Sequence, residues 1–174
     1  MPAPGKTLIS AQQIQRRVTT LARSIKAHYK GRPLTVVGLM NGSLFFLADL
    51  LRKLPSDTRI ECWKVSSYRG RKSTGKIRGL DAVSGDYRGR AVLIVDDILD
   101  TGQTLFEVRR KLRRAGARDI RVCVLLSKEV RRTKPVLADW AGFGIADQFV
   151  IGYGLDLNHQ YRQLPMIRIL DRET

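Results

Sequence analysis

Residues 92–104 read Val-Leu-Ile-Val-Asp-Asp-Ile-Leu-Asp-Thr-Gly-Gln-Thr, and they are the strongest indication of the fold class. Four apolar residues lead directly into the adjacent carboxylates Asp96 and Asp97, and a polar turn containing glycine then opens a helical pattern. A short, wholly apolar run is typical of a strand that is buried on both faces of a parallel sheet. The pattern therefore predicts a strand over 91–95 and a helix over about 104–115.

Strands and helices alternate along the rest of the chain. Ser10 and Gln13 have the spacing of a capping box at the start of the first helix, and Gly31 follows the end of that helix. Strand, helix and strand in succession imply right-handed βαβ units, so we expect an α/β fold with a twisted, mainly parallel sheet flanked by helices. The other predicted elements are a helix over 10–28, a strand over 34–40, a helix from the turn at 41–43 to about 54, strands over 59–66 and 120–126, and short strands after 142.

Composition limits the classes of protein and partner. No apolar stretch approaches the ~20 residues that span a bilayer, and the first residues lack the apolar core of a secretory signal. Cys62 and Cys123 both lie in strand-like apolar surroundings, so we expect buried free thiols and a reducing, cytoplasmic setting. The net charge of +16 favours polyanionic partners, which include phosphorylated metabolites and nucleic acid.

The chemistry is expected at the end of the strand over 91–95, because open α/β sheets bind ligands beyond the carboxyl ends of their strands. The amides at the helix start, with the hydroxyls of Thr101 and Thr104, form a predicted phosphate cradle. Asp96 and Asp97 are suited to sugar hydroxyls and to a hydrated Mg²⁺. A phosphate and a diol on one turn indicate a ribose 5-phosphate.

The stretch over 92–104 resembles the signature with which type I phosphoribosyltransferases bind 5-phosphoribosyl-1-pyrophosphate (PRPP), and the other motifs resemble the hypoxanthine-guanine branch. The resemblance covers nearly the whole chain. It implies one domain over 1–174, with a core over about 31–145 and a small hood formed by 1–30 and 146–174. It also implies that Mg²⁺ is required, and that PRPP is bound by Asp96, Asp97, Asp100, Thr101, Gly102, Gln103 and Thr104.

Two loops and one arginine are similar to the family's pyrophosphate site. Residues 38–43 resemble the loop that aims backbone amides at pyrophosphate through a non-proline cis peptide, which by position is Met40–Asn41. Many members carry Lys or Arg at the position of Asn41, and Gly42 follows it. The basic, glycine-rich segment over 67–79 resembles a lid that begins with Ser67 and Tyr68. The resemblance assigns pyrophosphate contacts to Asn41, Gly42, Ser67, Tyr68 and Arg162.

The purine site is implied by two further segments. The resemblance assigns Lys128, at the end of a strand, to the 6-oxo group of the base. Phe149 corresponds to the side chain that stacks on the purine, and the Val150 backbone corresponds to the contact with the base edge. Asp156 would hold a second Mg²⁺ through water, which makes Asp96, Asp97 and Asp156 the implied metal-binding residues.

The activity implied is transfer of a phosphoribosyl group from PRPP to hypoxanthine or guanine, giving IMP or GMP and pyrophosphate. Asp100 corresponds to the proposed general base at N7 of the purine. Two alternatives stay open: a regulator of the same fold that binds RNA or DNA, and a phosphoribosyltransferase for another purine. Lys128 and the Phe149 segment disfavour adenine, whereas xanthine remains possible. The family also implies a homodimer or a homotetramer.

Overall fold

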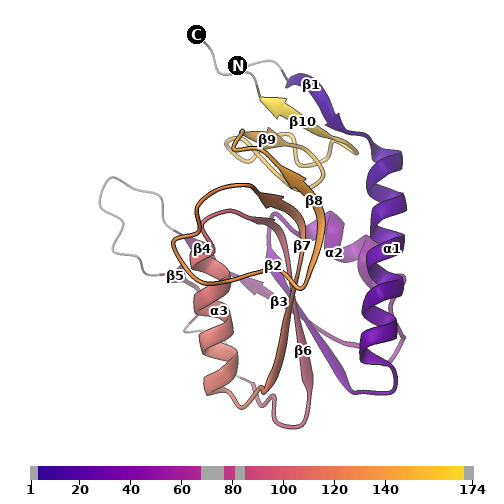
Figure 1. Ribbon diagram of the computed structural model, residues 1–174, viewed down its shortest axis with the longest axis vertical. Coiled ribbons are helices and arrows are strands. Elements are labelled where there is room, and N and C mark those ends of the chain that lie inside the picture. The colour runs from indigo at the N-terminus through magenta and orange to yellow at the C-terminus, as the bar shows by residue number, and fades with distance from the viewer. Residues whose placement is uncertain (1–3, 68–76, 81–84, 171–174) are drawn as a thin grey trace.

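The computed structural model describes residues 4–67, 77–80 and 85–170. A five-stranded sheet forms its centre, and a smaller three-stranded sheet covers one end (Figure 1). In chain order the elements are β1 (Pro4–Ile9), α1 (Ala11–Tyr29), β2 (Leu34–Met40), α2 (Leu44–Leu51), β3 (Arg59–Lys64), β4 (Ser66–Ser67), β5 (Ile77–Arg78), β6 (Ala91–Leu99), α3 (Gln103–Arg114), β7 (Asp119–Lys128), β8 (Trp140–Ile145), β9 (Val150–Ile151) and β10 (Ile167–Leu170).

The central sheet has the strand order β3-β2-β6-β7-β8, and every neighbouring pair is parallel. Helices α1 and α2 cover one face, whereas α3 covers the other (Figure 1). Successive residues of β6 point to opposite faces, so Leu93 packs under α1 and α2 while Ile94 packs under α3. Both side chains are fully buried, as expected for a parallel sheet covered on both sides. The predicted α/β architecture is confirmed.

Strand β6 extends four residues beyond the predicted strand over 91–95. Its pairing with β7 includes Asp96 opposite Val124 and Leu99 opposite Ser127. The acids therefore lie within a strand and not after it. Sequence alone did not reveal this, because the carboxylates break the apolar run while the backbone pairing continues past them.

The first helix begins as predicted. The Ser10 hydroxyl accepts a hydrogen bond from the Gln13 amide, and the Gln13 side chain accepts one from the Ser10 amide. Strand β1, before this helix, was not predicted. It pairs antiparallel with β10, which pairs with β9, so the opening segment and the tail of the chain meet in the small sheet.

The two cysteines differ in their surroundings. Both are free thiols, and Cys123 is buried in β7 as expected. Cys62 is exposed, because it lies on β3 at the edge of the sheet, so the expectation of burial was wrong for this residue. Among the described residues, no helix is long and apolar enough to cross a membrane.

Candidate active site

A cavity of about 490 Å³ lies at the carboxyl ends of β2 and β6 and at the start of α3. Its walls come from four parts of the chain: the turn after β2, the end of β3, the stretch from Asp96 to Leu105, and the segment around Asp156. This is the position at which parallel α/β sheets bind their ligands. Of the predicted site residues, the cavity wall contains Asn41, Gly42, Asp96, Asp97, Asp100, Thr101, Gly102, Gln103, Thr104, Asp156 and Arg162.

The paired carboxylates are held by the backbone that follows them. A carboxylate oxygen of Asp96 accepts a hydrogen bond from the Asp97 amide at 3.0 Å, and one of Asp97 accepts from the Ile98 amide at 2.7 Å. Burial, with the neighbouring Asp97 carboxylate, raises the pKa of Asp96 well above its ordinary value. Burial also raises the pKa of Asp97, although the charge of Arg162 acts in the opposite direction. The pair therefore favours a cation or a hydroxyl donor as a ligand.

Asp96→Asn is expected to raise the thermal unfolding temperature of the protein without ligand, by more at pH 8 than at pH 5. Below the ordinary pKa of 3.8 the carboxyl is protonated in both folded and unfolded chains, so it has no pH-dependent effect there. As pH rises, the unfolded chain releases this proton more readily than the folded one, which lowers the stability of the native protein. Asn removes that penalty and keeps an oxygen for the Asp97 amide.

Thermal melts at the two pH values, in EDTA, measure this difference. Asp57→Asn removes an exposed carboxylate and is the matched control. The destabilisation assigned to the Asp96 carboxylate would be contradicted by an equal change in unfolding temperature in both variants. It would also be contradicted if the increase were smaller at pH 8 than at pH 5.

The predicted phosphate turn opens α3 without a capping side chain. Its N-cap residue is Gly102, with φ of 83°, a left-handed conformation that glycine adopts without steric cost. The first helical turn and the side chains of Thr101 and Thr104 line the cavity. A phosphate suits this turn, because the amides at the start of a helix point toward an anion bound there.

The loop over 132–134, after β7, forms hydrogen bonds to this turn that the sequence did not reveal. The amides of Thr133 and Lys134 donate hydrogen bonds to the Thr101 carbonyl at 3.0 and 3.3 Å. The Arg132 guanidinium donates to the Leu99 carbonyl at 3.0 Å and to the Ser127 hydroxyl at 2.9 Å. No periodicity marks this loop, so only the three-dimensional contacts identify it. Lys64, at the end of β3, and His159 line the cavity itself, and neither was predicted as a site residue.

Glycines let three separate segments meet beside the acids. A Cβ atom on Gly42 would lie 1.7 Å from a carboxylate oxygen of Asp97, and one on Gly154 would lie 1.9 Å from the Gly42 carbonyl oxygen. Gly154 also has φ of 104°. The peptide between Met40 and Asn41, just before this contact, is cis as predicted. The turn after β2 is thus packed between β6 and the tail segment.

Asp156 and Arg162 form an ion pair at 2.8 Å on the cavity wall. Asp156 also accepts a hydrogen bond from the His159 amide at 2.7 Å, and an Arg162 nitrogen donates to the Gly154 carbonyl. The family resemblance implies separate ligands for these two side chains, a metal for Asp156 and pyrophosphate for Arg162. The structure makes them neighbours, so a metal and an anion bound by them would lie side by side.

Of the residues predicted to bind the purine, Asp156 lines this cavity, whereas Lys128, Phe149 and Val150 do not. The Lys128 ammonium lies 3.7 Å from an Asp100 carboxylate oxygen and 2.9 Å from one of Asp147. This pairing connects the end of β7 to the phosphate turn. Phe149 is 43% exposed, which leaves an aromatic ring open to a ligand, whereas Val150 is buried in β9. Ser67 ends β4, and Tyr68 lies outside the described residues.

The carboxylates fit Mg²⁺ only together with further ligands. Their oxygens are the hard donors that this ion prefers. Within residues 4–67, 77–80 and 85–170, no group of three or more His, Cys, Asp or Glu side chains is arranged to hold a metal. Mg²⁺ commonly keeps several waters and is bound by one or two carboxylates and substrate phosphates. Asp96, Asp97 and Asp156 suit an ion that enters with a phosphorylated substrate.

A family model and the sequence relatives both indicate a phosphoribosyltransferase. Residues 5–158 match the model of the phosphoribosyl transferase domain. The chain is 40% identical to a hypoxanthine-guanine phosphoribosyltransferase of Aquifex aeolicus, over 95% of this chain and 94% of the relative. It is 38% identical to a hypoxanthine phosphoribosyltransferase of Escherichia coli, over 93% of each.

A solved structure agrees with these sequence relatives. The crystal structure of a hypoxanthine-guanine phosphoribosyltransferase of Bacillus anthracis superposes with a TM-score of 0.90 at 34% identity, covering 97% of this chain and all of the other. The match spans both the parallel sheet and the tail segment around Asp156. The chain therefore belongs to the phosphoribosyltransferase family, within its hypoxanthine-guanine group.

Proposed function

We propose that this protein transfers the phosphoribosyl group of PRPP to N9 of hypoxanthine or guanine and releases pyrophosphate. The observation that carries this proposal is one cavity that joins the start of α3, two adjacent carboxylates and the Asp156–Arg162 pair. The helix start suits the 5-phosphate, the acids suit the ribose hydroxyls, and the arginine suits pyrophosphate.

Each group then has a role in displacement at ribose C1. The turn over 101–104 fixes the 5-phosphate, and Asp96 and Asp97 accept hydrogen bonds from the ribose hydroxyls. This fixes the sugar in the orientation that the reaction requires. Arg162 stabilises negative charge on the departing pyrophosphate. Mg²⁺, held by Asp96, Asp97 and Asp156 with the substrate, would neutralise more of that charge.

The base is held on the other side of the sugar. Phe149 offers its exposed ring to the purine face, and Val150 places a backbone segment at the base edge. Lys128 donates to the 6-oxo group, and Asp100 accepts the proton at N7 as N9 forms its bond to C1. The distance of 3.7 Å between the Lys128 ammonium and an Asp100 carboxylate oxygen supports contacts of both side chains with one ring.

A base-selectivity assay with PRPP and Mg²⁺ tests the proposal. We expect pyrophosphate release with hypoxanthine and guanine and none with adenine, because Lys128 can donate to an oxo group and cannot accept from an amino group. Turnover of xanthine alone would favour the xanthine alternative. Absence of turnover with every purine would contradict an enzymatic function and leave the regulator.

Lys128→Gln is expected to lower kcat/KM for hypoxanthine by about 10- to 100-fold, because a hydrogen bond from a charged donor is lost. KM for PRPP should change little, since Lys128 does not line the PRPP cavity. Steady-state kinetics with each substrate varied in turn measure both effects. Lys26→Gln removes an exposed lysine of α1 and serves as the control. A loss confined to PRPP would contradict the role given to Lys128.

A further inference from the structure

The opposite end of the central sheet carries a row of arginines. Parallel strands begin together at one edge, and each of four neighbouring strands has an arginine at or just before its first residue. In sheet order these are Arg59 for β3, Arg32 for β2, Arg90 for β6 and Arg118 for β7. Adjacent strands lie about 4.8 Å apart, so this edge concentrates positive charge. These arginines lie at the far end of the strands from the active site.

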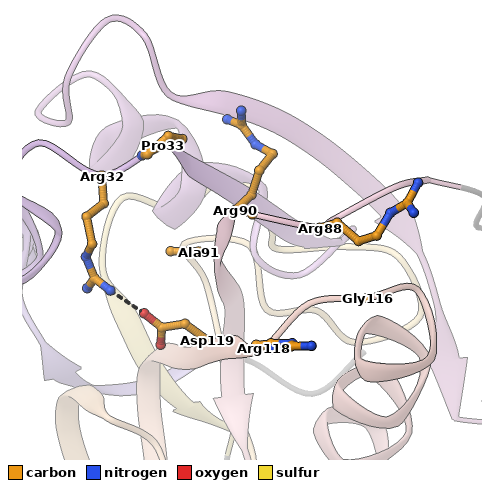
Figure 2. A pocket seen from close by; sticks show the side chains of 9 residues that line it. Arg32, Pro33, Arg88, Arg90, Ala91, Gly116, Arg118 and Asp119 are labelled. Atoms are coloured by element: carbon orange, nitrogen blue, oxygen red, sulfur yellow. Dashed lines mark hydrogen bonds and ion pairs between the residues drawn. The ribbon is translucent and has the colours of Figure 1, made fainter.

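A hollow of about 600 Å³ opens among three of these arginines and Arg88 (Figure 2). The loop before β6 forms one side of it, and the loop between α3 and β7 forms the other. Figure 2 shows Arg32 and Asp119 pointing toward each other across it, with Arg118 beside Asp119. A volume of this size is typical of small-molecule sites.

The walls of the hollow are joined by backbone hydrogen bonds. The Ala91 amide donates to the Pro33 carbonyl at 3.1 Å, and the Tyr87 amide donates to the Ala115 carbonyl at 3.2 Å. The stem of Arg88 lies across Gly116, where a Cβ atom would come within 2.7 Å of its Cγ. The segments before β2, before β6 and before β7 are therefore fixed to one another. These contacts are made by the chain itself, so the hollow is part of the fold.

Positive charge exceeds negative charge in this wall. Arg32 is paired with Asp119 at 2.6 Å, and Asp119 is the single acid that lines the hollow. Within the described part of the chain Arg90 donates to neutral oxygens, those of the Thr35 hydroxyl at 2.7 Å and the Leu34 carbonyl at 3.0 Å. The described lining of the hollow thus contains four arginines and one aspartate.

The two outer arginines are the most accessible to a ligand. Arg88 is bound to Asp86, which lies outside the hollow, at 2.8 Å, and its side chain is 81% exposed. Arg118 is exposed, and within the described part of the chain it forms no ion pair. Neither side chain contributes to the active-site cavity. Arg118 can therefore turn toward an anion without losing an ion pair, whereas Arg88 would exchange its bond to Asp86 for one to the anion.

The arginines that line this hollow favour a phosphate ligand. Guanidinium groups bind phosphate oxygens through paired N–H donors, and several of them together match an anion of several charges. None of the residues that line the hollow is aromatic, so single-stranded nucleic acid would find no stacking platform here. A second hollow of about 340 Å³ shares Arg32, Pro33 and Arg90 with the first, and apolar side chains such as Leu34 and Leu54 line it. An organic group attached to the phosphates has space there.

We propose that the arginine hollow binds an oligophosphate anion, either free or as the phosphate chain of a nucleotide. This site is separate from the PRPP cavity and does not depend on the activity proposed above. Inorganic tripolyphosphate and GTP are suitable probes, because they share the phosphate chain and differ in the attached nucleoside.

Titration calorimetry of the full chain, in 150 mM NaCl, tests the proposal. Both probes are also expected to occupy the PRPP cavity, so we expect two binding events for the unchanged protein. The double variant Arg88→Ala/Arg118→Ala should weaken one event by about tenfold or more, since charge-assisted hydrogen bonds are lost. Phosphoribosyl transfer by this variant should stay unchanged.

Arg113→Ala/Arg114→Ala provides the matched control, because it removes the same charge from exposed positions of α3 outside the hollow. Equal weakening by both double variants would mean a general charge effect and would overturn the proposal, as would a single binding event in the unchanged protein. If the double variant unfolds at a lower temperature than the unchanged protein, the same titration is made with Arg118→Ala, which should also weaken one binding event. Tighter binding of GTP than of tripolyphosphate identifies a nucleotide site, and equal binding identifies a free oligophosphate.

Discussion

Asp100→Asn is expected to lower kcat with hypoxanthine by about two to three orders of magnitude, while KM for PRPP changes by less than about threefold. General acid–base catalysis by a positioned side chain contributes factors of this size. Asp100 lines the PRPP cavity, and its carboxylate lies 3.7 Å from the Lys128 ammonium. Asn keeps the shape of the side chain and cannot accept the N7 proton, so chemistry should be lost while binding persists.

Single-turnover kinetics separate the two effects, with PRPP affinity measured by calorimetry. Asp147→Asn is the informative control, because Asp147 holds the same lysine at 2.9 Å and does not line the cavity. If both variants lose turnover equally, Asp100 acts by positioning Lys128 and not as the base. Equal loss of PRPP binding and turnover in Asp100→Asn would likewise contradict the assigned proton transfer.

Gly154→Ala is expected to lower the free energy of unfolding by about 3 kcal/mol and to abolish most activity. The residue has φ of 104°, a conformation that side chains rarely adopt. The added methyl group would also lie 1.9 Å from the Gly42 carbonyl oxygen. Backbone cannot rotate out of the way as a side chain can. The turn after β2 would have to move, and it is part of the cavity wall.

Denaturant unfolding gives the free energy, and initial rates give the activity. Gly31→Ala measures the cost of the left-handed backbone conformation alone, because Gly31 has φ of 70° and no atom lies within 4 Å of the place where a Cβ would be added. That variant should lose only about 1 kcal/mol and keep its activity. Similar losses at the two glycines would mean that the contact between Gly154 and Gly42 has no separate importance.

Much of this fold could be predicted because local signals and tertiary structure agree. The apolar runs over 34–40 and 91–95 are strands that both faces of the sheet bury, so their composition alone identifies them. The capping box at Ser10 is a local signal and holds in three dimensions. The predicted residues at 96–104 are contiguous, which let one stretch indicate about half of the cavity wall.

Features built from distant segments were harder to predict. Strand β1 exists because it pairs with β10, and nothing in residues 4–9 alone requires a strand. Arg132 supports the phosphate turn from a loop with no regular pattern. The ion pair between Asp156 and Arg162 also depends on a turn whose conformation the sequence does not specify. Each of these features depends on a contact with another part of the chain, and the periodicity of the sequence does not predict such contacts.

The pairing of β1 with β10 has a practical consequence for engineering. Pro4 and Leu170 are direct partners in this small sheet, so the two ends of the described chain lie together (Figure 1). A short peptide linker could therefore join them, and new ends could be opened at a surface loop elsewhere. A ring-closed version would have fewer conformations available when denatured, which favours the native form without changing any catalytic contact.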